Sequence, residues 1–173
     1  MSLLGIPVSP LIATLNKWSK YLDDGTEMGI WEKLKLATSG EGEVLVELSK
    51  SDHLILRVAL ARNPKTPPSV LEVLASDPRF IVREAVARNP NVTERALRIL
   101  SEDPSYVIRK IVAGNPRTPE DVLRELARDP EDLVREVVAS NPRTPEDVLR
   151  ELARDRNPLI SAAAMNTLFN ILR

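Results

Sequence analysis

The chain has 173 residues, of which 43% are hydrophobic, 28% are charged and only 3% are aromatic. Its 24 basic and 25 acidic residues give a formal net charge of −1, which provides no general attraction to nucleic acid or to an anionic membrane. The absence of cysteine excludes disulfides, thiolate zinc sites, cysteine-ligated iron–sulfur clusters and a cysteine nucleophile. The longest uncharged run, Ser2 to Asn16, contains two prolines and is too short to cross a bilayer. We therefore expect a cytoplasmic protein with an aliphatic core and with no metal or cofactor.

Residues 1–28 are predicted to form an N-terminal helical cap outside the repeats described below. Ser9 and Pro10 favour a helix start, with the serine as N-cap and the proline at the first helical position. Apolar residues then follow at helical spacing and predict one apolar face: Leu11, Ile12, Leu15, Trp18 and Leu22. From Gly29 to Ser51 a repeat is present but weakly matched, and Ser39 to Glu43 is expected to be a loop.

Residues 29–155 contain a repeat with a period of 26 residues, which is the distance along the sequence from Asn115 to Asn141. The stretch NPRTPEDVLRELARD occurs twice without change, at Asn115–Asp129 and Asn141–Asp155, and looser copies begin at Asn63 and Asn89. A fixed period of this length is typical of a solenoid, in which each repeat contacts only its neighbours. Asp-Pro and Asn-Pro dipeptides divide each repeat into halves, because proline disfavours the α conformation in the residue before it. Each repeat is thus predicted to hold a first helix after Asp-Pro and a second helix after Asn-Pro.

The start of the second helix carries a capping signature. Thr118 is predicted to be the N-cap, Pro119 the first helical residue, and Asp121 the third member of a T-x-x-D capping box. Thr144 with Asp147 repeats this pattern, and Thr66 with Pro67 keeps the cap. Sequence leaves open whether the shorter helices are α or partly 3₁₀.

Aliphatic residues recur once per repeat in columns that define the predicted core. In each helix the columns are three or four residues apart, which places them on one helical face. Each such side chain contributes roughly 1.5–3 kcal/mol on burial, before entropy is subtracted. In the second helix the columns are Leu45, Leu71, Leu97, Leu123, Leu149 and Leu48, Leu74, Leu100, Leu126, Leu152. In the first helix they are Leu56, Val82, Ile108, Val134, Ile160 and Leu60, Val86, Val112, Val138, with Ala61, Ala87, Ala113, Ala139 predicted where helices of adjacent repeats approach closely.

Residues 156–173 are predicted to be a C-terminal cap whose final helix runs to Leu172. The chain as a whole, residues 1–173, is therefore expected to be a single all-α domain: an alpha solenoid of about five paired-helix repeats with a cap at each end.

The repeats resemble the leucine-rich repeat variant (LRV) family. The family pattern combines an Asp-Pro, a V-R-x-x-V-A segment and N-P-x-T-P-x-x-x-L-x-x-L-A, and it is matched most fully from Val134 to Ala153, within a resemblance that extends from about Ala37 to Asp155. The resemblance implies alternating α and 3₁₀ helices stacked into a right-handed superhelix without a β-sheet, similar to HEAT and armadillo repeats. The founding type carries a cysteine-rich iron–sulfur region, which a chain without cysteine cannot provide, so no redox function is expected. The family implies no defined activity.

The most regular polar feature is an arginine column: Arg57, Arg83, Arg109 and Arg135. One interpretation is a basic series that binds phosphates along a groove. The other is that each arginine pairs with an acidic residue or carbonyl of the next repeat, such as the Asp77, Asp103 and Asp129 column. The second is favoured, because residues that recur in every repeat usually serve stacking.

The asparagine column, Asn63, Asn89, Asn115 and Asn141, also has two interpretations. It could bind a ligand peptide, as in armadillo-type grooves, or it could accept local backbone N–H groups in the Asn-Pro turns, which is favoured. His53, the only histidine, is expected at the surface, and the carboxylate pairs Asp23-Asp24 and Glu120-Asp121 are expected at helix ends. Trp18, Tyr21 and Trp31 are expected in the packing of the cap or in an interaction patch.

Three functions are compatible with this sequence. The leading one is a non-enzymatic scaffold that binds a protein or peptide on the concave surface of a solenoid. The alternative is nucleic-acid binding through Arg57, Arg83, Arg109 and Arg135, against which stand the near-neutral charge and the scarcity of aromatic residues. The third is a HEAT-like glycosylase, but no residue is suited to its catalytic role, so no enzyme is predicted. The sequence does not indicate an oligomeric state.

Overall fold

The computed structural model describes residues 29, 33, 37 and 42–172, and all regular secondary structure in them is α-helical. The chain divides into two compact units, Met1–Asn91 and Val92–Arg173. Both units show paired helices stacked on one another, as in an alpha solenoid, which confirms the predicted fold class. The prediction of one domain over residues 1–173 stays a prediction, and the helix expected within residues 1–28 lies outside the described residues.

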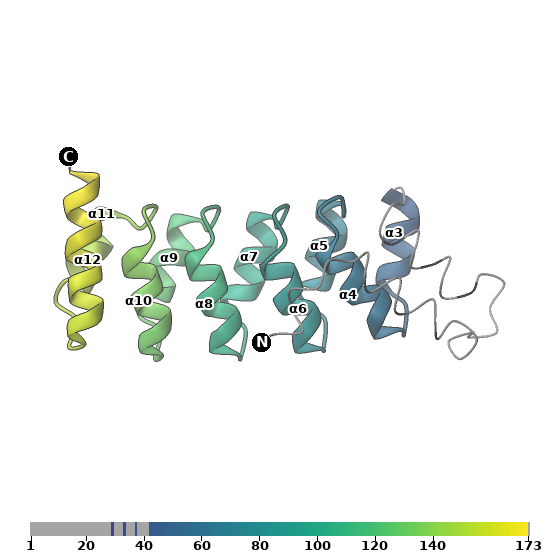
Figure 1. The fold of residues 1–173 in the computed structure, drawn as a ribbon, viewed down its shortest axis with the longest axis horizontal. Coiled ribbons are helices and arrows are strands. Elements are labelled where there is room, and N and C mark those ends of the chain that lie inside the picture. Colours follow the sequence, from purple (N-terminus) through teal and green to yellow (C-terminus); the bar gives the residue numbers. More distant parts are fainter. Residues whose placement is uncertain (1–28, 30–32, 34–36, 38–41, 173) are drawn as a thin grey trace, which may run out of the picture. The chain divides into compact units, whose positions relative to one another are not determined.

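The described part of the first unit contains α3 (Gly42–Ser49), α4 (Leu54–Arg62), α5 (Pro68–Leu74) and α6 (Phe80–Ala87). The first helices α4 and α6 pack side by side, and the second helices α3 and α5 form a row behind them (Figure 1). The prediction of a loop over Ser39 to Glu43 is wrong at its end, since α3 already begins at Gly42. Leu45 and Leu48 are buried in the same columns as in later repeats, and this burial extends the helix over the glycine.

The second unit contains α7 (Glu94–Ser101), α8 (Tyr106–Gly114), α9 (Glu120–Leu126), α10 (Asp132–Ser140), α11 (Glu146–Leu152) and α12 (Pro158–Ile171). The first helices α8, α10 and α12 form one row, in which α10 packs against both neighbours. The second helices α7, α9 and α11 each pack against a first helix on the other side of the core. The helix predicted to run to Leu172 ends at Ile171, with Leu172 as its C-cap.

Proline-containing turns end the helices where the sequence predicts. Asn63, Asn115 and Asn141 precede prolines, and all three have extended backbones with ψ of 120°, 129° and 122°. The helices between these turns are short, and even α5, α9 and α11, at 7 residues each, are α rather than 3₁₀.

The predicted columns form the core of both units. Every member of the five columns is buried, and an additional column, four residues before the Leu74 column, is buried as well: Val70, Ala96, Val122 and Val148. The missed column completes the apolar stripe of each second helix. The period of the repeat thus located five of the buried columns from the sequence, but not this additional one.

The predicted capping role of Thr66, Thr118 and Thr144 is wrong. In these repeats the N-cap is the following proline, and no side chain caps the helix. The threonine is buried instead, and its hydroxyl donates to a carbonyl at the end of the preceding first helix: Leu60 O (2.7 Å), Val112 O (2.5 Å) and Val138 O (2.6 Å).

The one of these repeats that has no threonine at this position shows why the position is buried. Val92 occupies it and is equally buried, while Thr93, one residue later, is the N-cap of α7 and accepts from the Ala96 amide at 3.0 Å. The position therefore selects a β-branched side chain for packing, and the hydroxyl of threonine is satisfied locally.

We expect Thr118→Ser to destabilise the second unit by about 1 kcal/mol, because it removes a fully buried methyl group and leaves the hydroxyl. Thr93→Ser is the matched control and should be nearly neutral, since serine and threonine are both good N-caps. Urea denaturation of both variants checks this. Equal effects of the two substitutions would show that Thr118 acts as a cap.

Candidate functional site

The arginine column is held by the acidic residues that follow it in the fold. In the first unit, Arg57 pairs with Asp77, with Nε 2.6 Å from Oδ2, and its Nη1 donates to Ser51 O at 2.7 Å. Arg83 donates through Nη1 to the carbonyls of Asp77 and Pro78, at 2.8 and 3.2 Å. Each of these guanidinium groups therefore lies against a turn that precedes its own helix.

The second unit repeats the arrangement with more contacts. Arg109 makes a bidentate pair with Asp129, through Nε at 2.6 Å and Nη2 at 2.9 Å, and donates to Asp103 O at 2.8 Å. Arg135, which is buried, pairs with Asp155 at 2.9 Å and with Asp132 at 2.5 Å, and it donates to Asp129 O at 2.8 Å. For Arg57, Arg109 and Arg135 the predicted pairing with the next repeat is confirmed.

The carboxylates of the aspartate column are also held by backbone amides of their own turns. Each accepts through Oδ1 from the amide two residues later, at 2.8–2.9 Å: Asp77, Asp103, Asp129 and Asp155. This turn orients the carboxylate before the arginine reaches it. Each arginine–aspartate pair is therefore preorganised and carries no net charge.

These contacts shift the carboxyl pKa values. Hydrogen bonding from Arg135 is the main cause that lowers the pKa of Asp155 below its ordinary value of 3.8, with help from the Asn157 amide. Burial alone would raise the pKa of Asp129, but the hydrogen bonds from Arg109 and the Glu131 amide outweigh it and lower the pKa. Both carboxylates are therefore ionised throughout the neutral range.

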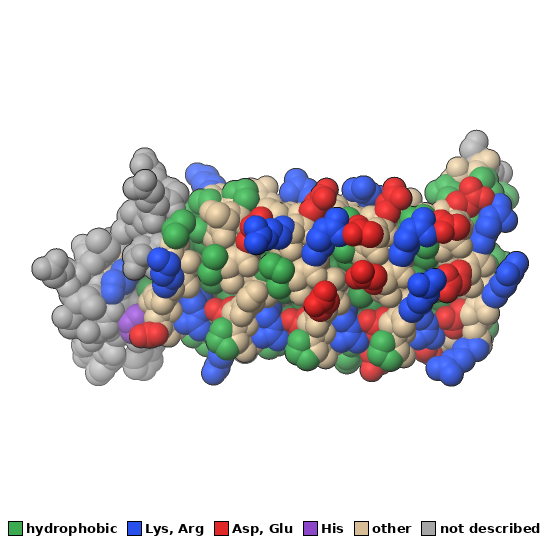
Figure 2. All heavy atoms as spheres, turned by 180° about the vertical axis from the view of Figure 1, so that it is seen from behind, with side chains coloured by type: hydrophobic (Ala, Val, Ile, Leu, Met, Phe, Trp, Pro, Cys, Tyr) green, Lys and Arg blue, Asp and Glu red, His purple; other side chains and the backbone are tan. Residues whose placement is uncertain are grey.

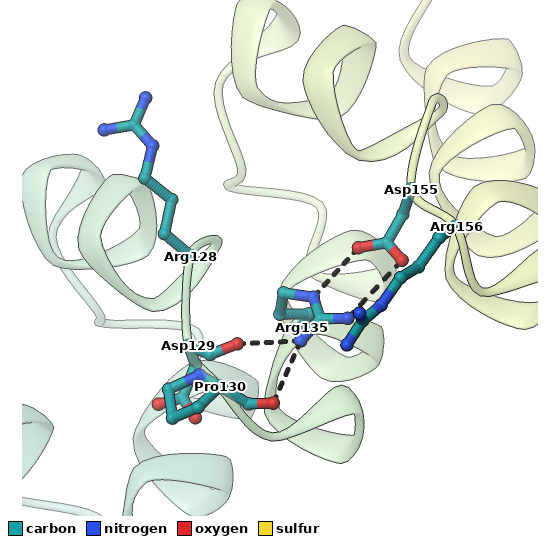
Figure 3. Close-up of a pocket in the computed structure, with 6 residues that line it drawn as sticks. All are labelled: Arg128, Asp129, Pro130, Arg135, Asp155 and Arg156. Atoms are coloured by element: carbon teal, nitrogen blue, oxygen red, sulfur yellow. Dashed lines mark hydrogen bonds and ion pairs between the residues drawn. The ribbon is translucent and has the colours of Figure 1, made fainter.

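A pocket of about 400 Å³ lies beside Arg135 and is lined by Arg128, Asp129, Pro130, Arg135, Asp155 and Arg156. Figure 3 shows Arg135 between the Asp129–Pro130 turn and Asp155, while Arg128 extends away from this cluster. The lining mixes guanidinium and carboxylate groups, so an anion here would meet two aspartates. A pocket of about 390 Å³ occupies the equivalent place beside Arg57 and Asp77 in the first unit.

The asparagine column serves the turns and also joins repeats. Each Oδ1 accepts from the amide two residues later, at 2.8–2.9 Å, as predicted for turn chemistry: Asn63, Asn89, Asn115 and Asn141. The side-chain amides of Asn63, Asn89 and Asn141 also donate backward to carbonyls of the preceding repeat, at 2.7–2.8 Å: Ala37 O, Ala61 O and Ala113 O. These three asparagines are buried, so their donors face the protein interior and not a ligand.

The outer surface of the second helices carries neutral pairs of opposite charge. Each pair joins an arginine of one second helix or the turn after it to an acidic residue of the next: Arg98 to Asp121, Arg124 to Asp147 and Arg128 to Glu151. Figure 2 shows basic and acidic side chains alternating over α9 and α11. Such a surface offers no single-sign stripe for a phosphate backbone.

The first helices carry a feature that sequence reasoning missed. An apolar residue precedes each member of the column that contains Val82 and Ile108, and it faces solvent at least in part. We call these residues the apolar row: Ile55 and Ile81 in the first unit, Val107, Leu133 and Leu159 in the second. Leu133 is 44% exposed and Leu159 65% exposed. The sequence did contain a sign of the apolar row, since two neighbouring positions of each first helix are apolar in every repeat. Adjacent residues of a helix point in different directions, so only one of the two positions can face the core.

Two further residues widen the apolar row in the second unit. Ile111 and Val137 lie four residues after Val107 and Leu133, which places them on the same side of α8 and α10. Both are half-buried. The row is therefore broadest over these two helices.

Other predicted candidates contribute little. His53 is half-buried at the N-cap of α4, and Glu120-Asp121 opens α9, where Asp121 pairs with Arg98. Asp23-Asp24, Trp18, Tyr21 and Trp31 lie outside the described residues. Over residues 42–172 no three acidic or histidine side chains come together as metal ligands, and no helix is long and apolar enough to span a membrane.

Comparison with known families gives one result. Residues 106–131, which comprise α8, α9 and the turn after them, match the leucine rich repeat variant family. The predicted resemblance is thereby confirmed for this repeat. No curated protein matches the chain.

The paired carboxylates predict how stability depends on pH. A lowered pKa in the folded state stabilises the fold above pH 3.8, the ordinary pKa, and this stabilisation is lost as pH falls toward the folded-state pKa. We expect Arg135→Gln to destabilise the second unit by about 3 kcal/mol at pH 7, because Asp155 loses its cation. The difference in unfolding free energy between Arg135→Gln and the wild type should be smaller at pH 3. The part that remains should come from the lost hydrogen bonds between Arg135 and backbone carbonyls.

Urea denaturation of the wild type and of Arg135→Gln at pH 7 and at pH 3 measures the destabilisation at each pH. Arg124→Gln is the matched control, since it removes an arginine from an exposed pair and should leave the midpoint nearly unchanged. A difference between Arg135→Gln and wild type that stays constant between the two pH values would rule out the ion pair as its source.

Proposed function

We propose that this chain, which carries a repeat of the leucine-rich repeat variant family, is a non-enzymatic scaffold that binds a protein or peptide along the part of the apolar row that lies in its second unit, Val107, Leu133 and Leu159. The observation that carries the proposal is the exposure of Leu133 and Leu159 on adjacent helices, α10 and α12. Large exposed aliphatic side chains in a row cost solubility and are typical of interaction surfaces.

The chemistry around the row indicates the class of partner. Glu136 lies three residues after Leu133 and therefore on the same side of α10. Residues 116–141 carry four arginines against seven acids, a net charge of −3. A partner segment with an aliphatic anchor and a basic neighbour would bury the first against Leu133 and pair the second with Glu136.

The nucleic-acid alternative rests on the arginine column, and the geometry counts against it. The guanidinium groups of Arg57, Arg109 and Arg135 already donate hydrogen bonds to aspartates and backbone carbonyls. Their side chains are 14%, 13% and 8% exposed. A phosphate could bind them only by displacing a preorganised carboxylate, which would leave that carboxylate buried without a cation. The same residues are better explained by stacking.

The peptide surface can be tested with a random peptide library selected on the immobilised chain, followed by fluorescence polarisation with the selected peptides. We expect peptides with an aliphatic residue next to Lys or Arg, and at least a tenfold loss of affinity for Leu133→Glu, which places a charge in the row. Val73→Glu on α5 is the matched control, because Val73 is 56% exposed and lies off the row. Equal losses in both variants, or binding that resists Leu133→Glu, would contradict the proposal.

A titration of labelled single- and double-stranded DNA at two salt concentrations tests the alternative. We expect no micromolar binding at low salt, because Arg57, Arg109 and Arg135 are paired with aspartates and basic and acidic side chains alternate over α9 and α11 (Figure 2). Micromolar binding that weakens steeply with salt and is reduced by Arg109→Gln would favour nucleic acid over peptide.

A further inference from the structure

The outer face of α12 in the second unit is apolar and carries no charged side chain. Ala162, Met165, Phe169 and Leu172 follow one another at spacings of three, four and three, which places them on one stripe of the helix. Met165, Phe169 and Leu172 are 55%, 58% and 63% exposed. The helix has 14 residues and carries no ionisable side chain. We call these four residues the α12 stripe.

The stripe coincides with the surface on which repeats stack. Met165 follows Ala139 by one period of the repeat and so continues the alanine column. In the preceding repeats of this unit that column is fully buried, and the carbonyl of Ala113 receives the Asn141 amide of the next repeat. At Met165 the same position is open to solvent, so α12 presents a stacking face.

Another repeat of the same type does not fit this face. Ser161 stands where the arginine column would continue, and its hydroxyl donates to Ala153 O at 2.7 Å. A following repeat would bring an aspartate that an arginine neutralises elsewhere, as in the Arg109–Asp129 pair, and here it would be buried without a cation. Methionine in place of alanine would also hold the next helix further away.

The stripe is complementary to itself. If two copies of α12 meet antiparallel with Met165 opposite Phe169 of the other copy, Ala162 falls opposite Leu172, since the two pairs have the same midpoint along the helix. Each large side chain then faces a smaller or more flexible one, and no like charges meet because the helix carries none. A twofold axis relates the two halves of this arrangement.

We propose that the α12 stripe is the interface of a homodimer in which two copies of the chain pair antiparallel through α12. The helix is about 21 Å long at 1.5 Å per residue, so the interface is small. Small interfaces are typical of weak complexes, so we expect a reversible dimer with a dissociation constant of about 1–100 μM. The homodimer leaves Leu133 on α10 available to another partner.

Sedimentation equilibrium of the full chain at concentrations from about 1 to 300 μM tests the proposal. The wild type should shift from monomer to dimer across this range. Met165→Glu should remain monomeric, because it would bury two carboxylates beside the apolar stripe. Leu133→Glu is the matched control, since Leu133 is also an exposed leucine but lies on α10 and not on α12, and this variant should dimerise as the wild type does.

A charge-pair variant tests the register. Phe169→Lys alone should be monomeric like Met165→Glu, whereas the double variant M165E/F169K should recover dimerisation, because each introduced glutamate then faces the introduced lysine of the other copy. A general loss of helix structure cannot produce such a recovery, and circular dichroism of each variant confirms that the helix content is kept. A wild type that stays monomeric at every concentration, a dimer that survives Met165→Glu, or a dimer lost in Leu133→Glu would overturn the proposal.

Discussion

Helices of seven to nine residues are too short to be stable alone in water, and α3 to α11 are all of this length. Prolines in the turns limit the length of each helix, so its stability must come from the neighbouring repeats. Two aliphatic columns in each helix supply most of it, since their members are buried in both units. The remaining features of the structure depend on keeping this stack in register.

Register is supplied by polar groups that would be costly to bury without a partner. The arginines reach forward to a carboxylate of the next repeat, and the asparagine amides reach back to carbonyls of the preceding one. Threonine joins the two helices within one repeat. The bonds are made in opposite directions along the chain, so a shift of one repeat against the next would break several at once. Regular polar columns are thus part of the stack, and the surface that can recognise a partner lies in residues outside them.

The sequence was sufficient for the architecture because a strict period sorts buried from exposed positions without knowledge of the structure. The columns of Leu71 and Val82 are buried as predicted, and the pairing of Arg109 with Asp129 follows from two polar columns with the same period. Thr118 was misinterpreted because threonine before proline is equally consistent with an N-cap and with a buried β-branched residue. Only the Val92 repeat separates these, since valine cannot cap.

The candidate surface was harder to predict than the core. Val107 and Ile108 are neighbours of similar hydrophobicity, and which of them is buried depends on the rotation of α8 about its axis. Helix rotation is set by the packing of both neighbouring rows, which no local pattern reports. The arginine column attracted attention by its regularity, although regularity in a repeat protein is evidence of stacking.

The polar contacts also bear on how such a chain can lengthen. Each repeat carries an arginine for the repeat after it, an aspartate for the repeat before it, and an asparagine that reaches back as well. A block of one whole repeat inserted at a repeat boundary therefore brings both halves of two interfaces, and no donor or acceptor is left without a counterpart. Genetic insertion of a whole repeat is structurally neutral for this reason, whereas insertion of any other length is not. The unchanged sequence at Asn115–Asp129 and Asn141–Asp155 is what a fold tolerant of such insertions permits.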